Sequence, residues 1–223
     1  MPRVKQKVLD QVSTLYDNVS LFKDEAFLKT LKGKWHTKVF GNKNPIILEV
    51  GMGNGGFLQQ MIQDYETQEL SFNYIGVEIR EFRLWKALRK NKVSVESGIL
   101  KLVATRAQNL KNFFKKGEVS RIHLNFSDPW PKNKHERHRL TSPEFLKIFH
   151  HILMKHGEIV MKTDNDMLYE YSLSTFPKCG FEIIEHSSHV HDTSFEVRKW
   201  VTEFESKFIK KGKKINYIRV KRI

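Results

Sequence analysis

Residues 46–56 read IILEVGMGNGG, a short apolar run followed at once by a stretch rich in glycine. The run comes directly after Pro45 and ends at Gly51, as expected of a short buried strand that leads into a turn. Glycines in such a turn let the backbone approach a ligand closely, and the helix that follows presents its free amide groups there. The stretch therefore predicts a strand, a ligand-binding turn and a helix that begins at about Gly56.

On both sides of this stretch the chain alternates short apolar runs with amphipathic segments, the pattern of a β-α-β-α fold. Further strands are expected at residues 74–79, 100–105, 122–126, 158–163, 181–186 and 215–222. Helices are expected at residues 81–95, 107–114, 141–157 and 165–177. Thr141 and Glu144 have the spacing of a capping box. Five parallel strands and a hairpin-like end predict an α/β, Rossmann-like domain with a seven-stranded, mostly parallel sheet and helices on both faces.

The length suits one domain, because 223 residues are enough for a single large α/β core. Residues 1–32 are basic and predict an N-terminal arm with one or two short helices, and residues 33–223 form the domain itself. The single cysteine, Cys179, excludes an internal disulfide and suits a reducing compartment. The sequence shows neither a signal peptide nor an apolar run of about 20 residues, so we expect a cytoplasmic protein without membrane contact.

The formal net charge of +14 at pH 7 is the first indication of function. A strongly basic protein suits a polyanionic partner such as RNA, because each phosphate that it neutralises releases counterions. A lysine-rich, solvated surface is the alternative explanation of the same composition. Charge alone therefore indicates a class of partner and names no activity.

Two ligands fit the glycines of residues 51–56, which satisfy both the G-x-G-x-x-G of dinucleotide-binding proteins and the G-x-G-x-G of enzymes that use S-adenosyl-L-methionine. Glu49 lies two residues before the first glycine, where a carboxylate would repel a pyrophosphate but attract a sulfonium and an amino group. Glu78 ends the second strand, where an acid can bind both ribose hydroxyls. S-adenosyl-L-methionine is therefore favoured, and an NAD-dependent dehydrogenase is the alternative.

The loop after the fourth strand, residues 125–140, reads NFSDPWPKNKHERHRL. Ligands of open α/β sheets bind at the carboxyl ends of the strands, so this loop faces the same site as the glycine turn. Trp130 can stack on an extruded base, and Asp128 can accept hydrogen bonds from the Watson–Crick edge of guanine. Basic side chains in the loop can hold phosphates; they are Lys132, Lys134, Arg137 and Arg139.

The sequence NFSDPWPKNKHERHRLT, residues 125–141, resembles the signature of the bacterial tRNA (guanine-N7-)-methyltransferase family. Four further blocks resemble that family in order and spacing: LEVGMGNGGF, YIGVEIR, KTDN and TEFESKF. The resemblance runs from about residue 20 to the C-terminus. It implies a class I methyltransferase that transfers a methyl group from S-adenosyl-L-methionine to N7 of the guanine at position 46 in the variable loop of tRNA.

The resemblance also implies roles for individual residues, with Asp128 as the catalytic residue. Cofactor contacts are expected from Glu49, Gly51, Gly53, Glu78, Arg106, Ala107 and Asp128. Substrate contacts are expected from Lys132, Asp164, Thr202, Glu203, Phe204 and Glu205. RNA contacts are expected from Lys134, His135, Glu136, Arg137, His138 and Arg139. Arg106 departs from the acidic or amide residue usual there and cannot accept a hydrogen bond from adenine, so main-chain atoms would recognise the adenine instead.

Guanine N7 has a lone pair and no proton, so its methylation needs no general base. Catalysis is then expected to depend on in-line positioning and on electrostatics, with Asp128 orienting the base and Asp164 and Glu205 as candidates to share that role. All of this requires the glycine turn and the Asp128–Trp130 loop to open onto a common cleft.

Other residues give weaker signals. His186, His189 and His191 lie in a polar stretch without a zinc-type pattern, so no metal is expected. Cys179 has no evident catalytic partners in the sequence. A non-catalytic RNA-binding protein is the second alternative, and Glu49, Glu78 and Asp128 argue against it. The expected partner is tRNA, with no obligate protein partner, and the chain is expected to be a monomer or homodimer.

Overall fold

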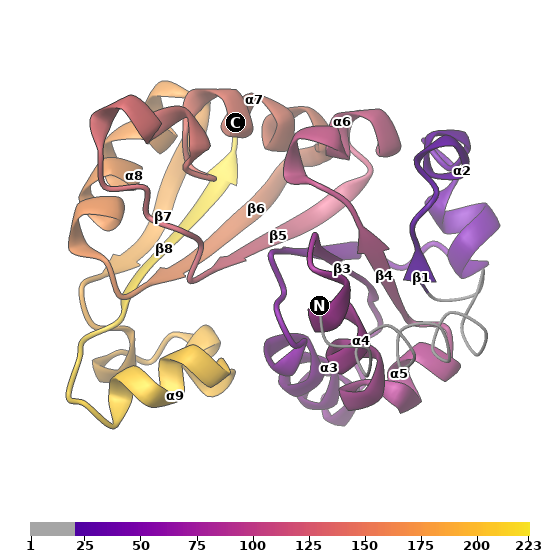
Figure 1. Cartoon of the computed structure of the whole chain (residues 1–223), viewed down its shortest axis with the longest axis horizontal. Coiled ribbons are helices and arrows are strands. Elements are labelled where there is room, and N and C mark those ends of the chain that lie inside the picture. Colours follow the sequence, from indigo (N-terminus) through magenta and orange to yellow (C-terminus); the bar gives the residue numbers. More distant parts are fainter. Residues whose placement is uncertain (1–20) are drawn as a thin grey trace, which may run out of the picture.

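The computed structural model describes residues 21–223 and shows one continuous sheet with the strand order β1-β4-β3-β2-β5-β6-β8-β7 (Figure 1). The strands are β1 Leu21–Phe22, β2 Ile46–Val50, β3 Asn73–Glu78, β4 Leu100–Ala104, β5 Val119–Asn125, β6 Leu153–Thr163, β7 Phe181–Ser187 and β8 Asn216–Arg222. The seven expected strands are β2 to β8, and β1 is an additional two-residue edge strand parallel to β4. Only β8 pairs antiparallel with its neighbours β6 and β7, which confirms the hairpin-like end.

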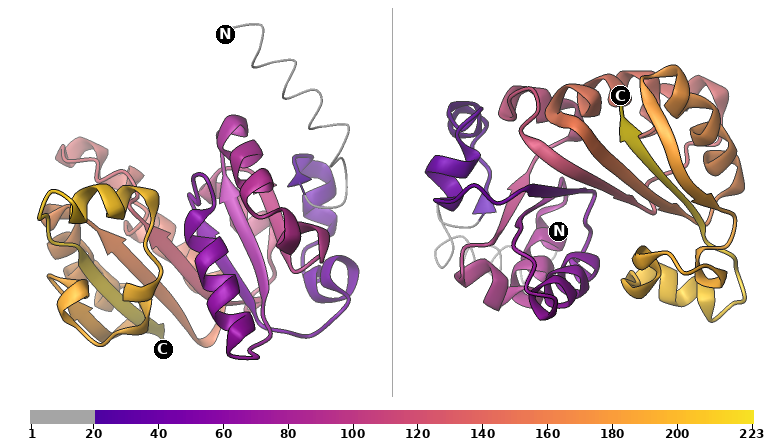
Figure 2. Two further views of the ribbon diagram at one scale, coloured as in Figure 1. Left: turned by 90° about the horizontal axis from the view of Figure 1, so that it is seen from below. Right: turned by 180° about the vertical axis from the view of Figure 1, so that it is seen from behind.

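Helices cover both faces of the sheet, as expected (Figures 1 and 2). On one face lie α3 Gly56–Thr67, α4 Glu81–Lys90, α5 Lys92–Glu96 and α9 Glu203–Ile209. On the other lie α6 Leu110–Phe113, α7 Pro143–Ile152 and α8 Asp166–Lys178. Shorter helical segments are α2 Glu25–Thr30, the π-helix Trp35–Phe40 and the 3-10 turns Ala107–Asn109, Asn133–His138, Val190–Asp192 and Glu196–Lys199.

Each face of the sheet has its own hydrophobic cluster. One contains Phe113, Phe149 and Phe176 under α6 to α8, and the other contains Phe57 and Trp200 under α3 and the segment before α9. Alternation along β5 explains the separation, because Ile122 and Leu124 belong to the first cluster while Arg121, His123 and Asn125 point to the opposite face. The α3/α9 face therefore carries polar side chains in the interior of the protein.

Two helix boundaries differ from the expectation. The capping box predicted from Thr141 and Glu144 is wrong, because α7 begins one residue later with Ser142 as N-cap and Pro143 in the first turn. Thr141 is buried, and its hydroxyl accepts a hydrogen bond of 2.8 Å from the Ser172 hydroxyl of α8 instead. At the other end Ile152 is the last helical residue, and β6 begins directly at Leu153 rather than after a glycine.

The single helix predicted at residues 81–95 is divided into α4 and α5 at Asn91. The Asn91 side chain is buried and donates to the carbonyl oxygens of Gly55, at 3.1 Å, and Ala87, at 3.0 Å. The break therefore ties α4 to the glycine turn.

The arm expected at residues 1–32 falls partly outside the described residues, which begin at residue 21. Within the described part, Leu28 and Leu31 are buried in the core beside Trp35, so residues 21–32 pack on the edge of the sheet. Between residues 21 and 223 no helix is long and apolar enough to cross a membrane.

Candidate functional site

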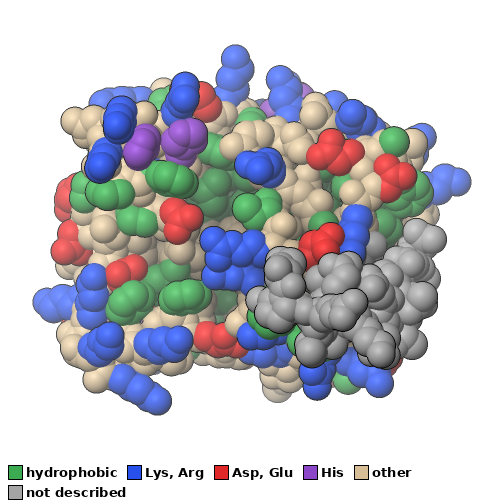
Figure 3. Space-filling model, in the orientation of Figure 1, with side chains coloured by type: hydrophobic (Ala, Val, Ile, Leu, Met, Phe, Trp, Pro, Cys, Tyr) green, Lys and Arg blue, Asp and Glu red, His purple; other side chains and the backbone are tan. Residues whose placement is uncertain are grey.

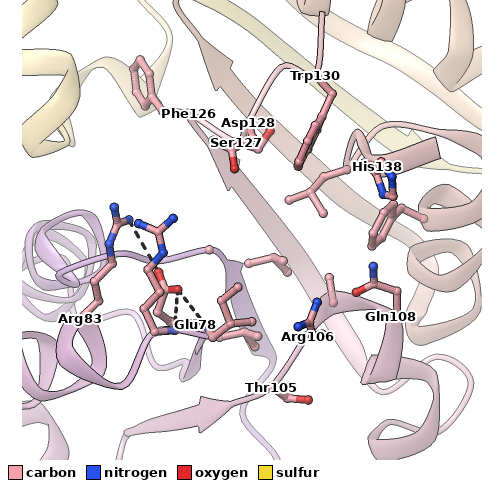
Figure 4. A pocket seen from close by; sticks show the side chains of 18 residues that line it. Glu78, Arg83, Thr105, Arg106, Gln108, Phe126, Ser127, Asp128, Trp130 and His138 are labelled. Atoms are coloured by element: carbon pink, nitrogen blue, oxygen red, sulfur yellow. Dashed lines mark hydrogen bonds and ion pairs between the residues drawn. The ribbon is translucent and has the colours of Figure 1, made fainter. Parts of the chain in front are cut away.

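A cavity of about 320 Å³ opens at the carboxyl ends of β2, β3, β4 and β5 (Figure 4). Gly51 of the glycine turn and Asp128 of the loop after β5 both line it, which confirms the common cleft expected from the sequence. Asp128 and Trp130 lie on one side of the cavity, with Glu78 and Arg106 across from them (Figure 4). A ligand in this cavity can therefore touch both sequence motifs at once.

Glu78 ends β3 and is only 6% exposed. Its Oε1 accepts hydrogen bonds from the backbone amides of Ile79, at 2.8 Å, and Arg80, at 3.0 Å. Its Oε2 lies 3.8 Å from Nη1 of Arg83. Amides and guanidinium hold the carboxylate at the cavity wall, where it can accept hydrogen bonds from the hydroxyls of a ligand.

Glu49 lies in β2 and lines a second cavity, which adjoins the first because both share Gly51, Arg83 and Phe126. Its Oε1 accepts a hydrogen bond of 2.9 Å from Nδ2 of Asn125, whereas its buried Oε2 has no hydrogen-bond partner among the described residues. Burial raises the pKa of Glu49 to about 8, against the opposing effects of Asn125 and of Lys162. A buried acid with a free oxygen is suited to binding a cationic group.

The glycine turn has the backbone conformation that its glycines predict. Gly51, Gly53 and Gly55 all have positive φ, at 79°, 58° and 72°. A side chain at Gly55 would collide with Asn91 and Ala87, whereas a Cβ added at Gly51 would meet nothing within 4 Å. Gly55 is therefore needed for packing against α4, and Gly51 leaves open space for a ligand.

Arg106 and Ala107 follow β4 and line the first cavity together with Thr105 and Gln108. The backbone of Arg106 is extended, and its carbonyl accepts a hydrogen bond of 3.0 Å from the Asn109 amide. Figure 4 shows the Arg106 side chain beside Gln108, across the cavity from Trp130. The structure thus places both predicted residues at the site and adds an amide side chain, Gln108, that the sequence reasoning did not include.

The loop after β5 separates its basic residues into two groups. Lys132, Lys134 and Arg137 are exposed, as expected of residues that meet RNA, and His138 reaches the wall of the first cavity. Arg139 is only 4% exposed. Its position in the interior differs from the RNA contact that the sequence predicted.

Of the residues expected to touch substrate, Thr202, Glu203 and Phe204 line the second cavity. Glu203 accepts a hydrogen bond of 2.8 Å from Asn54 and forms an ion pair with Lys90, so it joins α9 to the glycine turn and α4. Asp164 lies after β6 and pairs with Lys213 at 2.9 Å.

Glu205 does not face either cavity. It is fully buried, it pairs with the equally buried Lys162 at 2.5 Å, and it completes a capping box with Thr202 at the start of α9. A direct contact between Glu205 and a substrate would require this arrangement to open, so the structure favours a supporting position.

Besides Gln108, three further residues at the site were missed by the sequence reasoning. Arg83 lines both cavities, Asn125 orients Glu49, and Lys162 anchors α9 and the Trp200 carbonyl to β6. Asn125 and Lys162 stand in quoted sequence blocks, but only the pairing of β5 with β6 shows that they are neighbours, in register as Asn125↔Lys162.

The histidines considered for a metal have other partners. His186 lies 2.9 Å from the Tyr169 hydroxyl, His189 lies 2.6 Å from Asp192, and His191 lies 3.0 Å from Glu205. Within the described part of the chain no three His, Cys, Asp or Glu side chains come together as a potential metal site.

Comparison with known proteins gives consistent results. Residues 43–218 match the family described as "Putative methyltransferase". A tRNA (guanine-N(7)-)-methyltransferase of Listeria monocytogenes serovar 1/2a (strain ATCC BAA-679 / EGD-e) is 45% identical over 181 residues, which cover 81% of each chain. A protein of the same name from Geobacillus sp. (strain WCH70) is 42% identical over 190 residues, which cover 85% of this chain and 83% of that one.

Solved structures share the fold at low sequence identity. The 16S rRNA methyltransferase KamB superposes with a TM-score of 0.60 at 14% identity, over 90% of this chain and 94% of that one. Geranyl diphosphate C-methyltransferase from Streptomyces coelicolor A3(2), solved with Mg2+, geranyl-S-thiolodiphosphate and S-adenosyl-L-homocysteine, gives a TM-score of 0.53 at 16% identity, over 85% of this chain and 74% of that one. The sheet is therefore that of Rossmann-like methyltransferases.

Proposed function

The chain belongs to the tRNA (guanine-N(7)-)-methyltransferase family, and on that premise we propose that it methylates N7 of the guanine at position 46 in the variable loop of tRNA, with S-adenosyl-L-methionine as methyl donor. The observation that carries the proposal is the common cleft between the glycine turn and the Asp128–Trp130 loop. The family membership also sets aside the dehydrogenase alternative for the same glycine pattern. The enzyme acts on tRNA in the cytoplasm, as a monomer or homodimer without an obligate protein partner.

The residues of the cleft fit this cofactor, which supplies an electrophilic methyl group when bound. The buried Oε2 of Glu49, which has no hydrogen-bond partner in the described part of the chain, suits the positive charge of the cofactor's methionine portion. Glu78 is held by two amides in a position to bind the ribose hydroxyls. Arg106, Ala107 and Gln108 form the wall for the adenine, and Gly51 and Gly53 let the backbone come close.

The base is held by residues of the loop after β5. Asp128 accepts from N1–H or N2–H of guanine, which orients the base and stabilises the positive charge that the purine gains. Trp130 stacks on the base. Because N7 carries no proton, this chain supplies no general base. Its contribution is to align the guanine with the methyl group, to exclude water from the site and to balance the charge that develops on the base.

The tRNA backbone is held by exposed basic side chains on the same loop, chiefly Lys132, Lys134 and Arg137. Phosphate contacts of this kind position the RNA without reading its sequence. In Figure 3 Lys and Arg side chains are spread over the whole described face, and acidic side chains are fewer, which suits a large polyanionic substrate. Thr202, Glu203 and Phe204 contact the substrate from the second cavity, and Asp164 lies at the adjoining end of β6.

The direct test is nucleoside mass spectrometry of an unmodified tRNA transcript treated with the protein and S-adenosyl-L-methionine. We expect 7-methylguanosine with a transcript that has guanine at position 46 and none with a matched transcript that has adenine there. Methylation of a different atom or nucleoside would overturn the proposal. An Asp128→Asn variant that binds the cofactor normally and keeps full turnover would overturn the role of Asp128.

A further inference from the structure

The backbone of Trp130, the residue proposed to stack on the base, has an unusual conformation. Its φ is 45°, in the left-handed region that residues other than glycine rarely adopt, and no glycine stands in the loop to ease the turn. Its side chain is 37% exposed and lines the first cavity, with the ring of His138 at 5.1 Å between centroids. Such a conformation persists only where the surrounding structure holds it.

Arg139 supplies that support. Its Nε and Nη2 both donate to the carbonyl oxygen of Trp130, at 3.2 and 3.1 Å. Two donors from one planar group fix both the position and the direction of the carbonyl, which a single ammonium donor cannot do. The peptide that sets the direction of the Trp130 ring is therefore clamped nine residues further along the chain, at Arg139.

The guanidinium is itself fixed by α8. Its Cζ lies 4.4 Å from the centre of the Tyr171 ring, in a cation–π contact, and the whole residue is 4% exposed. Burial, and then the nearby Glu136, raise the pKa of Tyr171 to about 12, so the ring stays a neutral phenol at physiological pH. Helix α8 thus fixes the Arg139 side chain, and Arg139 in turn fixes the backbone of the loop after β5 at Trp130.

We propose that Arg139 is a positioning residue that presets Trp130 for stacking on the target base, and that it does not bind a tRNA phosphate. This rests on the proposed function and assigns Arg139 a role opposite to that of its neighbours in the basic run. Arg137, two residues before it, is exposed and free to meet phosphate. The two arginines form a matched pair for experiment.

The first experiment separates positioning from phosphate contact by salt. Steady-state kinetics on tRNA are measured between about 50 and 200 mM salt for Arg139→Gln and Arg137→Gln, each of which removes one positive charge. We expect Arg139→Gln to lower kcat/KM on the order of tenfold, mainly through kcat, with the salt dependence of the wild type. Arg137→Gln should instead raise KM and reduce the salt slope by about one. A reduced salt slope in Arg139→Gln would overturn the proposal.

The second experiment asks whether Arg139 acts through Trp130. Arg139→Lys is combined with Trp130→Ala, and kcat/KM is compared with that of Trp130→Ala alone. If Arg139 acts only by positioning the Trp130 ring, the Arg139→Lys change should have no further effect once Trp130→Ala has removed that ring. The double variant should then have the same kcat/KM as Trp130→Ala alone. Losses that multiply would overturn the proposal.

Tyr171→Leu tests the same chain of contacts without changing a charge, and it serves if Arg139→Lys folds poorly. We expect it to reproduce the loss in kcat, and Tyr171→Phe, which keeps the ring, to restore it. Calorimetric affinity for S-adenosyl-L-methionine should stay unchanged in the Arg139 and Tyr171 variants. Failure of the wild-type protein to form 7-methylguanosine would refute the proposed function, whereas multiplying losses in an active enzyme refute only the role of Arg139.

Discussion

Two lysine–glutamate pairs lie in contrasting regions of the molecule. Lys162 and Glu205 meet at 2.5 Å between β6 and α9, and both side chains are fully buried. Lys92 and Glu96 meet at 3.7 Å on one turn of α5, with side chains 62% and 54% exposed. The residue types are the same, but one pair is enclosed by protein and the other by water. Depth, rather than residue type, therefore decides what a charge does in this protein.

The buried pair connects separate elements of the fold, which the exposed pair does not. Nζ of Lys162 also donates to the Trp200 carbonyl at 2.6 Å, so one ammonium joins β6 to the segment before α9 and to α9 itself. Burial lowers the pKa of Lys162, against the opposing effect of Glu205. An ionised group in such a place depends on its partner, because a lone buried charge is costly.

The largest effect should follow from breaking that pair. Lys162→Met leaves Glu205 buried without its lysine and with the His191 ring, at 3.0 Å, as its remaining neighbour, and we expect the free energy of unfolding to fall by about 3–5 kcal/mol. Urea unfolding at neutral pH measures the loss. The double variant Lys162→Met/Glu205→Gln, which removes the lone charge and keeps a residue suited to the capping box, should regain part of it. Equal stability of the single and double variants would contradict this account.

Glu49 provides the next test, because it is a buried acid without a salt bridge to any residue between 21 and 223. Its pKa is about 8 in the folded protein and near 4.5 in the unfolded chain, so the folded state keeps a proton that the unfolded state loses. The resulting stabilisation is complete below pH 4.5 and is lost as the pH rises to about 8. The free energy of unfolding of the wild type, relative to that of Glu49→Gln, should therefore fall by a few kcal/mol between about pH 5 and 8. This is the order of magnitude expected from the shift in the pKa of Glu49.

The same acid predicts a proton linkage on binding the cofactor. A cation beside Glu49 favours the carboxylate, so a proton should be released at pH 7, where the free protein holds it. Calorimetry with S-adenosyl-L-methionine in buffers of different ionisation enthalpy measures the release, and Glu49→Gln should abolish it. A binding enthalpy that is independent of buffer in the wild type would be the contrary result.

Glu78 is also buried, but its carboxylate accepts from two backbone amides at the wall of the first cavity. Glu78→Gln removes the charge that would strengthen the hydrogen bonds we propose to the ribose hydroxyls, and we expect cofactor affinity to fall about tenfold or somewhat more. Glu81→Gln, an exposed acid at the start of α4, is the matched control and should bind as the wild type does. Similar losses in both variants would show that general charge, rather than the position of Glu78, is responsible.

The sequence was sufficient for the fold because its signals are local and strong. An apolar run that ends in glycines predicted β2 and α3 with the boundaries that the structure has, Ile46–Val50 and a helix start at Gly56. The break at Asn91 and the N-cap at Ser142 were not predictable in this way. Each depends on a buried side chain bonded to a distant element, Asn91 to the glycine turn and Thr141 to α8.

The candidate site shows the same division. Asp128, Glu78 and Gly51 were predicted to meet because the carboxyl ends of parallel strands lie along one edge. The basic run offered no means to distinguish Arg139 from Arg137, since the difference is whether Tyr171 of α8 stands behind the side chain. Likewise, the partner of Glu205 is Lys162 of β6, 43 residues earlier in the chain. Depth is a tertiary property, and neighbouring residues in the sequence do not report it.

The exposed pair should give the smallest effect, and it sets the scale for the others. Lys92→Ala and Glu96→Ala, alone and combined, form a double-mutant cycle whose coupling energy we expect to be about 0.3–0.5 kcal/mol at low salt. The coupling should shrink further as salt is added, because both side chains are screened by solvent. Urea unfolding of the four proteins measures it. A coupling energy as large as the loss expected from breaking the Lys162–Glu205 pair would contradict this explanation. Burial could then not be the reason why the two pairs differ.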